Sequence, residues 1–389
     1  MPASPMRMLT PYANQAKAEG VRVYHLNIGD PDIKSPPQML RVLNKWTSNP
    51  VPYGQSQGNQ ELISSFLKYY YGLGYKFLKP ENIQVTAGGS EAISMAFFSV
   101  ANAGDEILVF EPFYANYNGF AAVNSVNLVP VPTSISDGFH LPDRKTIEKY
   151  ISGKTRAIIL CNPNNPTGTV YSQKEVEILI SIARDRNLYF MSDEVYREFI
   201  YDGRKHVSVL DYMKANPDRV ILVDSLSKRF SVCGIRIGVL VSLNMNLMAG
   251  ALRIAQGRLS SGYVDQKIAE RMDKVPTGYL NNVRSEYDRR RIILYRALKS
   301  IPGIKVPKPE GAFYTIVGLP VDNAEDFCKW LLTDFRDKNE TVMLAPASGF
   351  YATPGAGNNE VRIAYVLNGK SLRRSVEILR KALEKFRKI

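Results

Sequence analysis

Short apolar runs recur along the first two thirds of the chain and alternate with helical or turn-rich stretches. Seven of them read as buried strands, near Ile83, Glu106, Val126, Ala157, Leu188 and Val220 and at 235–242, and a helical pattern over 173–187 separates two of them. This alternation predicts an α/β fold with a mostly parallel seven-stranded sheet flanked by helices. The run at 235–242 follows its predecessor too closely for a crossover helix, so we expect it to be antiparallel to its neighbour.

The remaining segments predict a second, smaller α+β domain. Its strand-like runs lie in GIKVPKPEGAFYTIV, TVMLAPASGF and EVRIAY. We therefore expect a large domain over 35–272 and a small domain formed by 1–34 together with 273–389. No internal repeat and no low-complexity linker interrupts this pattern.

The loop between the last two predicted strands of the sheet carries distinctive chemistry. Ser225 and Lys228 lie in SLSK, and Arg236 follows eight residues after the lysine. A lysine partly desolvated between apolar strands can form an imine with an aldehyde, and a hydroxyl and a guanidinium are suited to hold a phosphate dianion. An aldehyde that carries a phosphate suggests pyridoxal phosphate. The alternative interpretation of the same motif is a surface lysine and arginine beside two ordinary strands.

Two other predicted strands end in polar residues that could contact the same ligand. Asp193 follows the buried run at 188–191, and Tyr196 comes three residues later. A carboxylate there can pair with a protonated pyridine nitrogen, and a phenol can reach the phenolic oxygen of the ring. Asn165, in the turn of RAIILCNPNNPTG, could donate to that oxygen as well. Asp193 as a helix cap and Asn-Pro as a simple turn signal are the alternatives.

A glycine turn offers a place for the phosphate. NIQVTAGGSEAISMAFF predicts a strand that leads through Gly88, Gly89 and Ser90 into a helix. Glycine lets the backbone approach a ligand closely, and the N-terminus of a helix favours an anion. The segment lacks the endings of a P-loop and of a dinucleotide-binding turn. Tyr114, just beyond the next strand, could stack on a planar cofactor or pack in the core.

In this order, the motifs resemble those of the class I and II aminotransferases, the aspartate-aminotransferase-like branch of the fold type I pyridoxal-phosphate enzymes. The resemblance extends from HLNIGDPD to NEVRIAY, over nearly the whole chain. It implies that Lys228 forms the Schiff base with the cofactor and that Asp193 pairs with the pyridine nitrogen. It also implies that Asn165 and Tyr196 contact the ring oxygen and that Tyr114 stacks on the ring face. The phosphate would be held by Gly89, Ser90, Ser225 and Arg236.

The resemblance further implies how the substrate is bound and how subunits associate. Arg362, in EVRIAY, matches the arginine that grips the substrate α-carboxylate, with Gly29 of NIGDPD closing over it and Asn165 beside it. Tyr53, in VPYGQSQG, resembles the tyrosine that reaches the cofactor phosphate of the partner subunit. A homodimer with shared active sites follows. Gln55 stands where many relatives have a proline.

The implied reaction moves an amino group between an L-amino acid and a 2-oxo acid in a ping-pong cycle, with Lys228 transferring the α-proton. Arg258, in AQGRLSSGYVDQ, lies near the place where aspartate-using relatives carry an arginine for the second carboxylate of the partner's substrate. The turn that follows it has Gly262 instead of the usual proline, and the spacing is shorter. Aspartate and glutamate with 2-oxoglutarate are therefore the expected substrates. Alanine, aromatic or diaminopimelate specificity, or a C–S β-lyase on the same framework, stay open.

Composition limits the possible partners. No run of the 389 residues approaches the ~18–20 apolar residues of a membrane span, and no compact apolar signal core is present, so we expect a cytoplasmic protein without a membrane partner. The net charge of +13 could indicate nucleic-acid binding. However, the basic residues cluster in YDRRRIILYRALKS and LRRSVEILRKALEKFRKI, where their spacing predicts the solvated faces of helices. We expect no nucleic-acid partner.

Cysteine and histidine positions predict neither a disulfide framework nor a metal. The three cysteines are Cys161, Cys233 and Cys328, an odd and sparse set. The three histidines are His25, His140 and His206, which lie far apart and form no ligand spacing. We expect no structural or catalytic metal.

Overall fold

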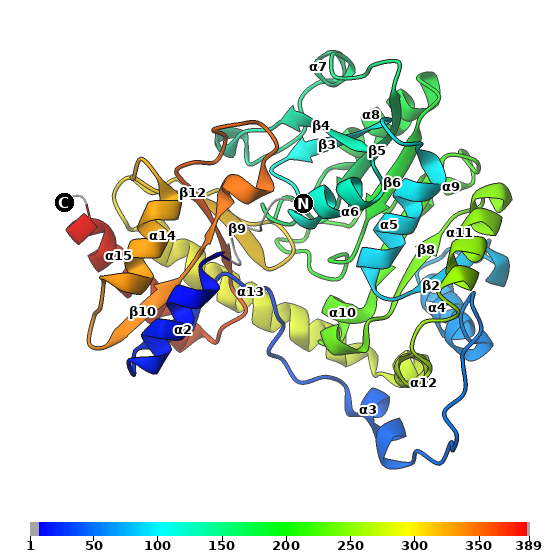
Figure 1. The fold of residues 1–389 in the computed structure, drawn as a ribbon, viewed down its shortest axis with the longest axis horizontal. Helices are drawn as coiled ribbons and strands as arrows, with labels where there is room; N and C mark the ends of the chain where they lie inside the picture. Colours follow the sequence, from blue (N-terminus) through cyan, green and yellow to red (C-terminus); the bar gives the residue numbers. More distant parts are fainter. Residues whose placement is uncertain (1–7, 387–389) are drawn as a thin grey trace.

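The computed structural model describes residues 8–386, in which two units are joined by a long helix (Figure 1). The larger unit contains a seven-stranded sheet of order β2-β8-β7-β6-β5-β3-β4. All strand pairs are parallel except those of β8, which is antiparallel to both β2 and β7. The strands are β2 (Ile83–Thr86), β3 (Glu106–Glu111), β4 (Asn127–Pro132), β5 (Thr155–Cys161), β6 (Tyr189–Asp193), β7 (Val220–Ser225) and β8 (Gly238–Val241). The predicted sheet and its antiparallel last strand are confirmed.

Helices cover both faces of this sheet, and alternate side chains of one strand belong to different cores. In β5, Ile158 and Leu160 join one core while Ala157 and Ile159 join the other. Because both faces of the inner strands are covered, these strands read as continuous apolar runs. One face packs against α5 (Gly89–Val100), α6 (Asn116–Val123) and α11 (Met245–Gly257). The other packs against α3 (Pro37–Asn44), α4 (Gln60–Gly72), α7 (Arg144–Glu148), α8 (Gln173–Asp185), α9 (Leu210–Met213) and α12 (Tyr263–Ala269).

Local signals explain the bounds of α8, the helix predicted over 173–187. Its first turn has a capping box, in which the Ser172 hydroxyl accepts from the Glu175 N–H and the Glu175 carboxylate accepts from the Ser172 N–H. The helix ends at Asp185, because Asn187, two residues later, adopts a left-handed conformation with φ of 58°.

The smaller unit combines both ends of the described chain (Figure 1). β1 (Arg22–His25) pairs in parallel with β10 (Glu340–Met343), and an antiparallel sheet has the order β11-β12-β9. Its members are β9 (Tyr314–Gly318), β11 (Ala345–Pro346) and β12 (Glu360–Ala364), with helices α2 (Thr10–Ala18), α13 (Thr277–Lys299), α14 (Ala324–Thr333) and α15 (Gly369–Phe386). The domain limits at 34/35 and 272/273 stay predictions, and residues 1–7 and 387–389 of the predicted small domain lie outside the described residues.

The prediction that the basic residues of the DRRR run lie on the solvated face of a helix is wrong for two of them, which belong to α13. Arg290 and Arg291 of the DRRR run are buried. Arg290 Nη1 donates to Asp32 Oδ1 at 2.6 Å, and the two Arg291 amino groups donate to the Asp202 carboxylate at 2.8 Å each. α13 connects the two units, so its basic side chains meet carboxylates of distant segments. Charges can be buried there because they are paired.

Candidate active site

The polar residues picked out from the sequence meet at the carboxyl ends of the parallel strands. A cavity there contains about 560 Å³ of space between atoms, its mouth included. Nine of the predicted site residues line it: Gly89, Ser90, Tyr114, Asn165, Asp193, Tyr196, Ser225, Lys228 and Arg236. Ile93, Cys161, Val195, Ser227 and Cys233 complete the lining without a predicted role. Strand ends of an open parallel sheet are where α/β proteins bind ligands.

Asp193, the last residue of β6, is the acidic residue among those that line this cavity. Its side chain is buried, and the Tyr117 hydroxyl donates to Oδ2 at 2.8 Å. Burial raises the pKa of Asp193 to about 6, against the lowering effect of the hydrogen bond from Tyr117. A buried carboxylate of this kind is suited to a cationic partner, such as the protonated nitrogen of a pyridine ring.

Lys228 lies on α10 (Leu226–Arg229), a short helix between β7 and β8. Its Nζ donates to the carbonyl oxygen of Gly29 at 2.9 Å and lies 3.5 Å from Cys233 Sγ. Gly29 belongs to the N-terminal segment that leads into the larger unit. The amine therefore stands where the chain segments of the two units meet, at the cavity wall.

Donors for an anion gather at one end of the cavity. α5 begins at Gly89 directly after Gly88, whose φ of 81° is left-handed and favours glycine. A Cβ at Gly88 would lie 2.4 Å from Arg236 Nη2, so glycine also makes room for the guanidinium. The hydroxyls of Ser90 and Ser225 line the same cavity. A helix N-terminus, hydroxyls and a guanidinium together form a donor set that fits a phosphate dianion.

Hydroxyl and amide groups of Asn165, Tyr196 and Tyr314 form a chain of polar contacts beside the cavity. Asn165 Nδ2 donates to the Tyr196 hydroxyl at 3.4 Å, and the Tyr196 and Tyr314 hydroxyls lie 3.1 Å apart. The Tyr314 hydroxyl also donates to the Gly29 carbonyl at 3.5 Å. Any Cβ at Gly29 would lie 1.8 Å from that hydroxyl, so Gly29 cannot be replaced without moving Tyr314.

Arg362, on β12 of the smaller unit, is held against this chain. Nη1 donates to Asn165 Oδ1 at 3.1 Å, and Nη2 donates to the Asn27 carbonyl at 2.6 Å. The guanidinium carbon lies 4.6 Å from the centre of the Tyr314 ring and 4.8 Å from that of Phe350. Arg362 is buried and oriented, as a cation that receives a carboxylate must be.

Four predicted site residues are not part of the cavity lining. Gly29 and Arg362 are hydrogen-bonded to residues that line it, whereas Tyr53 and Arg258 lie elsewhere. Tyr53 is 80% exposed. Arg258 ends α11, where Nε donates to Glu91 Oε1 at 2.6 Å and Nη2 donates to the Val85 carbonyl at 2.9 Å. Both residues were assigned to the site of a neighbouring subunit, so these positions leave their roles as predictions.

Sequence reasoning missed Tyr117, Tyr314 and Asn27. Tyr117 follows Tyr114 by three residues in YANY, a spacing that places both rings on one side of a helical turn. Tyr314 lies in EGAFYTIV, which was predicted as a strand without a site residue. Asn27 contacts Arg362 through its backbone carbonyl, so the residue type at this position could not indicate the contact.

None of the helices within residues 8–386 has both the length and the apolar content needed to span a membrane. Within the same range, no group of three or more histidine, cysteine, aspartate and glutamate side chains is arranged to hold a metal ion.

Comparison with known proteins gives similar sequences and folds. Residues 22–379 match the family aminotransferase class I and II. The chain is 31% identical over 374 residues to an aspartate aminotransferase of Pyrococcus horikoshii, which covers 93% of this chain and 91% of the relative. A single mutant of the Thermus thermophilus aspartate aminotransferase has a TM-score of 0.88 at 25% identity, with 98% of this chain and 97% of that chain covered. An alanine aminotransferase from Pyrococcus furiosus has a TM-score of 0.87 at 28% identity, with 98% of each chain covered.

The buried carboxylate of Asp193 predicts a pH-dependent loss of stability in the ligand-free protein. Its folded pKa of about 6 lies above the ordinary value of 3.8. The folded state therefore binds more protons between these values, and the free energy of unfolding falls as the pH rises from about 4 to about 6. Asp193→Asn removes this dependence. The variant should match wild type below about pH 4 and exceed it above about pH 6, by roughly 3 kcal/mol at most.

Denaturant unfolding of both proteins across this pH range measures the difference. A difference that stays constant with pH would show that Asp193 does not titrate in the expected range.

Proposed function

The chain belongs to the aminotransferase class I and II family, and from this premise we propose that it transfers the amino group of aspartate to 2-oxoglutarate, with glutamate as the product and as the amino donor of the reverse reaction. The protein is a pyridoxal-phosphate-dependent aminotransferase with the α/β fold of the aspartate aminotransferases. Relatives named aspartate aminotransferase support the acidic substrates. Because the chain is also similar to an alanine aminotransferase, neutral amino acids are the second candidate for the amino donor.

Pyridoxal phosphate, when bound, supplies an aldehyde and a ring that withdraws electrons from the substrate α-carbon. The polar groups of the cavity fit both the phosphate and the pyridine nitrogen of this cofactor. Arg236, Ser90, Ser225 and the N-terminus of α5 at Gly89 would hold the phosphate. Asp193 would keep the pyridine nitrogen protonated.

The remaining cavity residues would orient the ring. Asn165 and Tyr196, whose side chains already touch, would donate to the ring oxygen. Tyr114 lines the cavity and would lie against the ring face. These contacts would hold the ring in one orientation relative to the substrate and Lys228.

The observation that carries the assignment is the position of Arg362 relative to Lys228. Both residues donate to backbone carbonyls of one short segment, Arg362 to that of Asn27 and Lys228 to that of Gly29, two residues further along. A carboxylate on Arg362 would thus leave the adjoining α-carbon within the reach of an amine. Lys228 would take the α-proton and return it one atom further along, as the same group acting first as base and then as acid.

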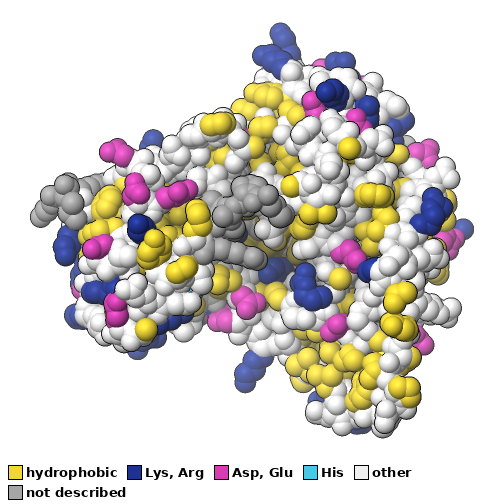
Figure 2. All heavy atoms as spheres, in the orientation of Figure 1, with side chains coloured by type: hydrophobic (Ala, Val, Ile, Leu, Met, Phe, Trp, Pro, Cys, Tyr) yellow, Lys and Arg dark blue, Asp and Glu magenta, His cyan; other side chains and the backbone are white. Residues whose placement is uncertain are grey.

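We infer a homodimer whose subunits complete each other's sites. Figure 2 shows hydrophobic side chains gathered over the area where Figure 1 places α3 and α12. Leu40, Leu43, Val51 and Tyr53 are exposed in this area. A second copy of the chain that covers this area would bury these side chains and bring Tyr53 to a cofactor phosphate. A cytoplasmic location without nucleic-acid partners is part of the same proposal.

The cofactor bond can be mapped directly. Borohydride reduction of the enzyme with pyridoxal phosphate should fix the cofactor on Lys228, and peptide mapping by mass spectrometry identifies the lysine. Lys228→Ala should lower turnover by several orders of magnitude, since both cofactor attachment and proton transfer are lost. An adduct on a different lysine would disprove the role of Lys228.

Substrate choice tests Arg258. Arg258→Ala should weaken the use of aspartate, measured as kcat/KM, by on the order of 2 to 5 kcal/mol, because the second carboxylate loses its partner. Alanine should be affected far less. Arg253→Ala is the matched control, since Arg253 is an exposed arginine on the same helix. Equal losses for aspartate and alanine, or a wild-type preference for neutral or aromatic donors, would remove Arg258 from the substrate site.

Subunit mixing tests Tyr53. Lys228→Ala and Tyr53→Ala homodimers should both have low activity. If Tyr53 serves the partner's site, a mixed dimer contains one intact site, and random mixing should restore about one quarter of the wild-type activity. Activity that never exceeds the average of the two separate proteins would place Tyr53 outside the shared site.

A further inference from the structure

The segment that carries Lys228 is too short to hold its own conformation. α10 has four residues, and helices this short are unstable without tertiary contacts. The direction of the Lys228 side chain is therefore set by what fixes the two ends of the segment. Asp224 and Arg229 stand at these ends. Asp224 precedes Ser225, and Arg229 follows Lys228.

A buried ion pair joins the two ends. Arg229 Nη2 donates to Asp224 Oδ2 at 2.7 Å, and both side chains are fully shielded from solvent. The other carboxylate oxygen, Asp224 Oδ1, accepts from the backbone N–H of Ser225 at 2.7 Å. Tyr70, on α4, donates to Asp224 Oδ2 at 3.0 Å. The pair thus closes the segment 224–229 on itself and anchors it to a helix outside the loop.

The same arginine reaches the turn that carries Tyr196. Arg229 Nε donates to Glu198 Oε1 at 3.2 Å, and Glu198 follows Tyr196 by two residues. The guanidinium carbon of Arg229 lies 4.1 Å from the centre of the Tyr69 ring, whose hydroxyl donates to Glu198. Arg229 therefore fixes the Lys228 segment relative to the Tyr196 segment, because its guanidinium contacts Asp224 in the first segment and Glu198 in the second.

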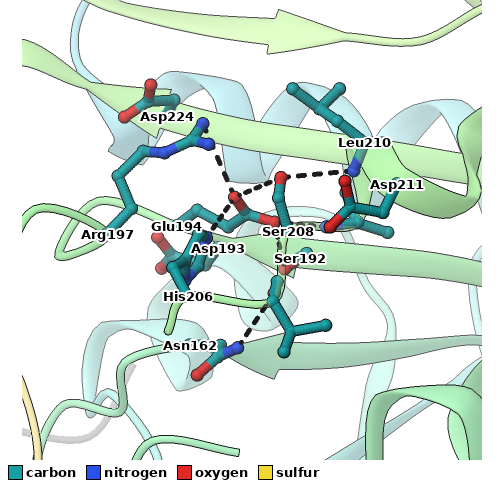
Figure 3. A network of polar contacts seen from close by, with 12 residues as sticks. Asn162, Ser192, Asp193, Glu194, Arg197, His206, Ser208, Leu210, Asp211 and Asp224 are labelled. Atoms are coloured by element: carbon teal, nitrogen blue, oxygen red, sulfur yellow. Dashed lines mark hydrogen bonds and ion pairs between the residues drawn. The ribbon is translucent and has the colours of Figure 1, made fainter. Parts of the chain in front are cut away.

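Further charges extend this network behind Asp193. Figure 3 shows Arg197 between the carboxylates of Asp224 and Glu194, and Arg197 Nη1 lies 3.6 Å from Glu194 Oε2. His206 Nε2 lies 2.7 Å from the same oxygen. Each arginine and carboxylate of the network is within two positions of a residue that lines the cavity. The network can therefore hold several strand ends in register without entering the site.

We propose that Asp224 and Arg229 are positioning residues for amino transfer: their buried pair aims Lys228 into the cavity and fixes it relative to Tyr196 before the cofactor binds. Neither side chain lines the cavity, so both act through Lys228. A displacement of about 1 Å at a reacting group can lower a rate by about 100-fold. The inference rests on the role proposed above for Lys228.

Arg229→Lys tests the pair, because an ammonium keeps the charge but cannot fork between Asp224 and Glu198. The rate of the first half-reaction at saturating amino donor should fall about 100-fold, with KM changed less than about threefold. Capture of pyridoxal phosphate at Lys228, trapped with borohydride, should be slower by about tenfold or more.

Arg291→Lys is the matched control. Arg291 is as deeply buried as Arg229 and is likewise paired with two carboxylates, those of Asp202 and Asp288. Unlike Arg229, it has no residue of the cavity lining within two positions in the chain. This variant should lose thermal stability to a similar extent while the capture rate and the half-reaction rate stay at the wild-type level. If Arg229→Lys behaves in the same way as Arg291→Lys, the pair only stabilises the fold and the proposal is overturned.

Hydrogen exchange of the wild-type protein without cofactor gives a test that needs no variant. Amides of 226–229 should exchange as slowly as those of β7, since the pair orders the segment in advance. Exchange at the rate of an exposed loop would overturn the proposal. Borohydride capture on a lysine other than Lys228 in wild type would instead refute the role of Lys228, so the two failures are distinguishable.

Discussion

The site depends on a carboxylate buried at the end of a central strand. Burial makes the charged form of Asp193 costly and raises its pKa to about 6, so the anion persists only beside donors and cations. Tyr117 supplies one donor. A protonated pyridine nitrogen would supply the cation, and the carboxylate would in return keep that nitrogen protonated. The same physical constraint explains why the arginines and carboxylates behind the cavity are paired with one another.

Much of this arrangement follows from the sequence for geometrical reasons. The apolar runs that form the sheet are continuous because helices cover both faces, which makes them recognisable. Residues such as Asn165, Asp193 and Ser225 each follow such a run. Because the carboxyl ends of parallel strands meet at one edge of a sheet, the positions of these residues in the sequence were enough to predict that their side chains lie close together.

Contacts between distant segments could not be predicted in this way. Tyr117 and Asp193 are 76 residues apart, and Tyr196 and Tyr314 are 118 apart. Nothing in the local pattern of either partner indicates the other. Arg290 has the spacing of a solvated helix face, and its burial depends on where α13 packs against the rest of the chain. Local pattern fixes which face of an element is apolar, whereas the partners of polar groups depend on the assembled fold.

Single half-reactions test the account most directly. The purified enzyme with pyridoxal phosphate is mixed with one amino acid at a time, without any 2-oxo acid, and both the absorbance of the cofactor and the products are followed. Aspartate and glutamate should convert the cofactor to its amino form and release one equivalent of oxaloacetate or 2-oxoglutarate. Catalytic release of ammonia or of a thiol with the cofactor unchanged, or no conversion by any amino acid, would contradict the account.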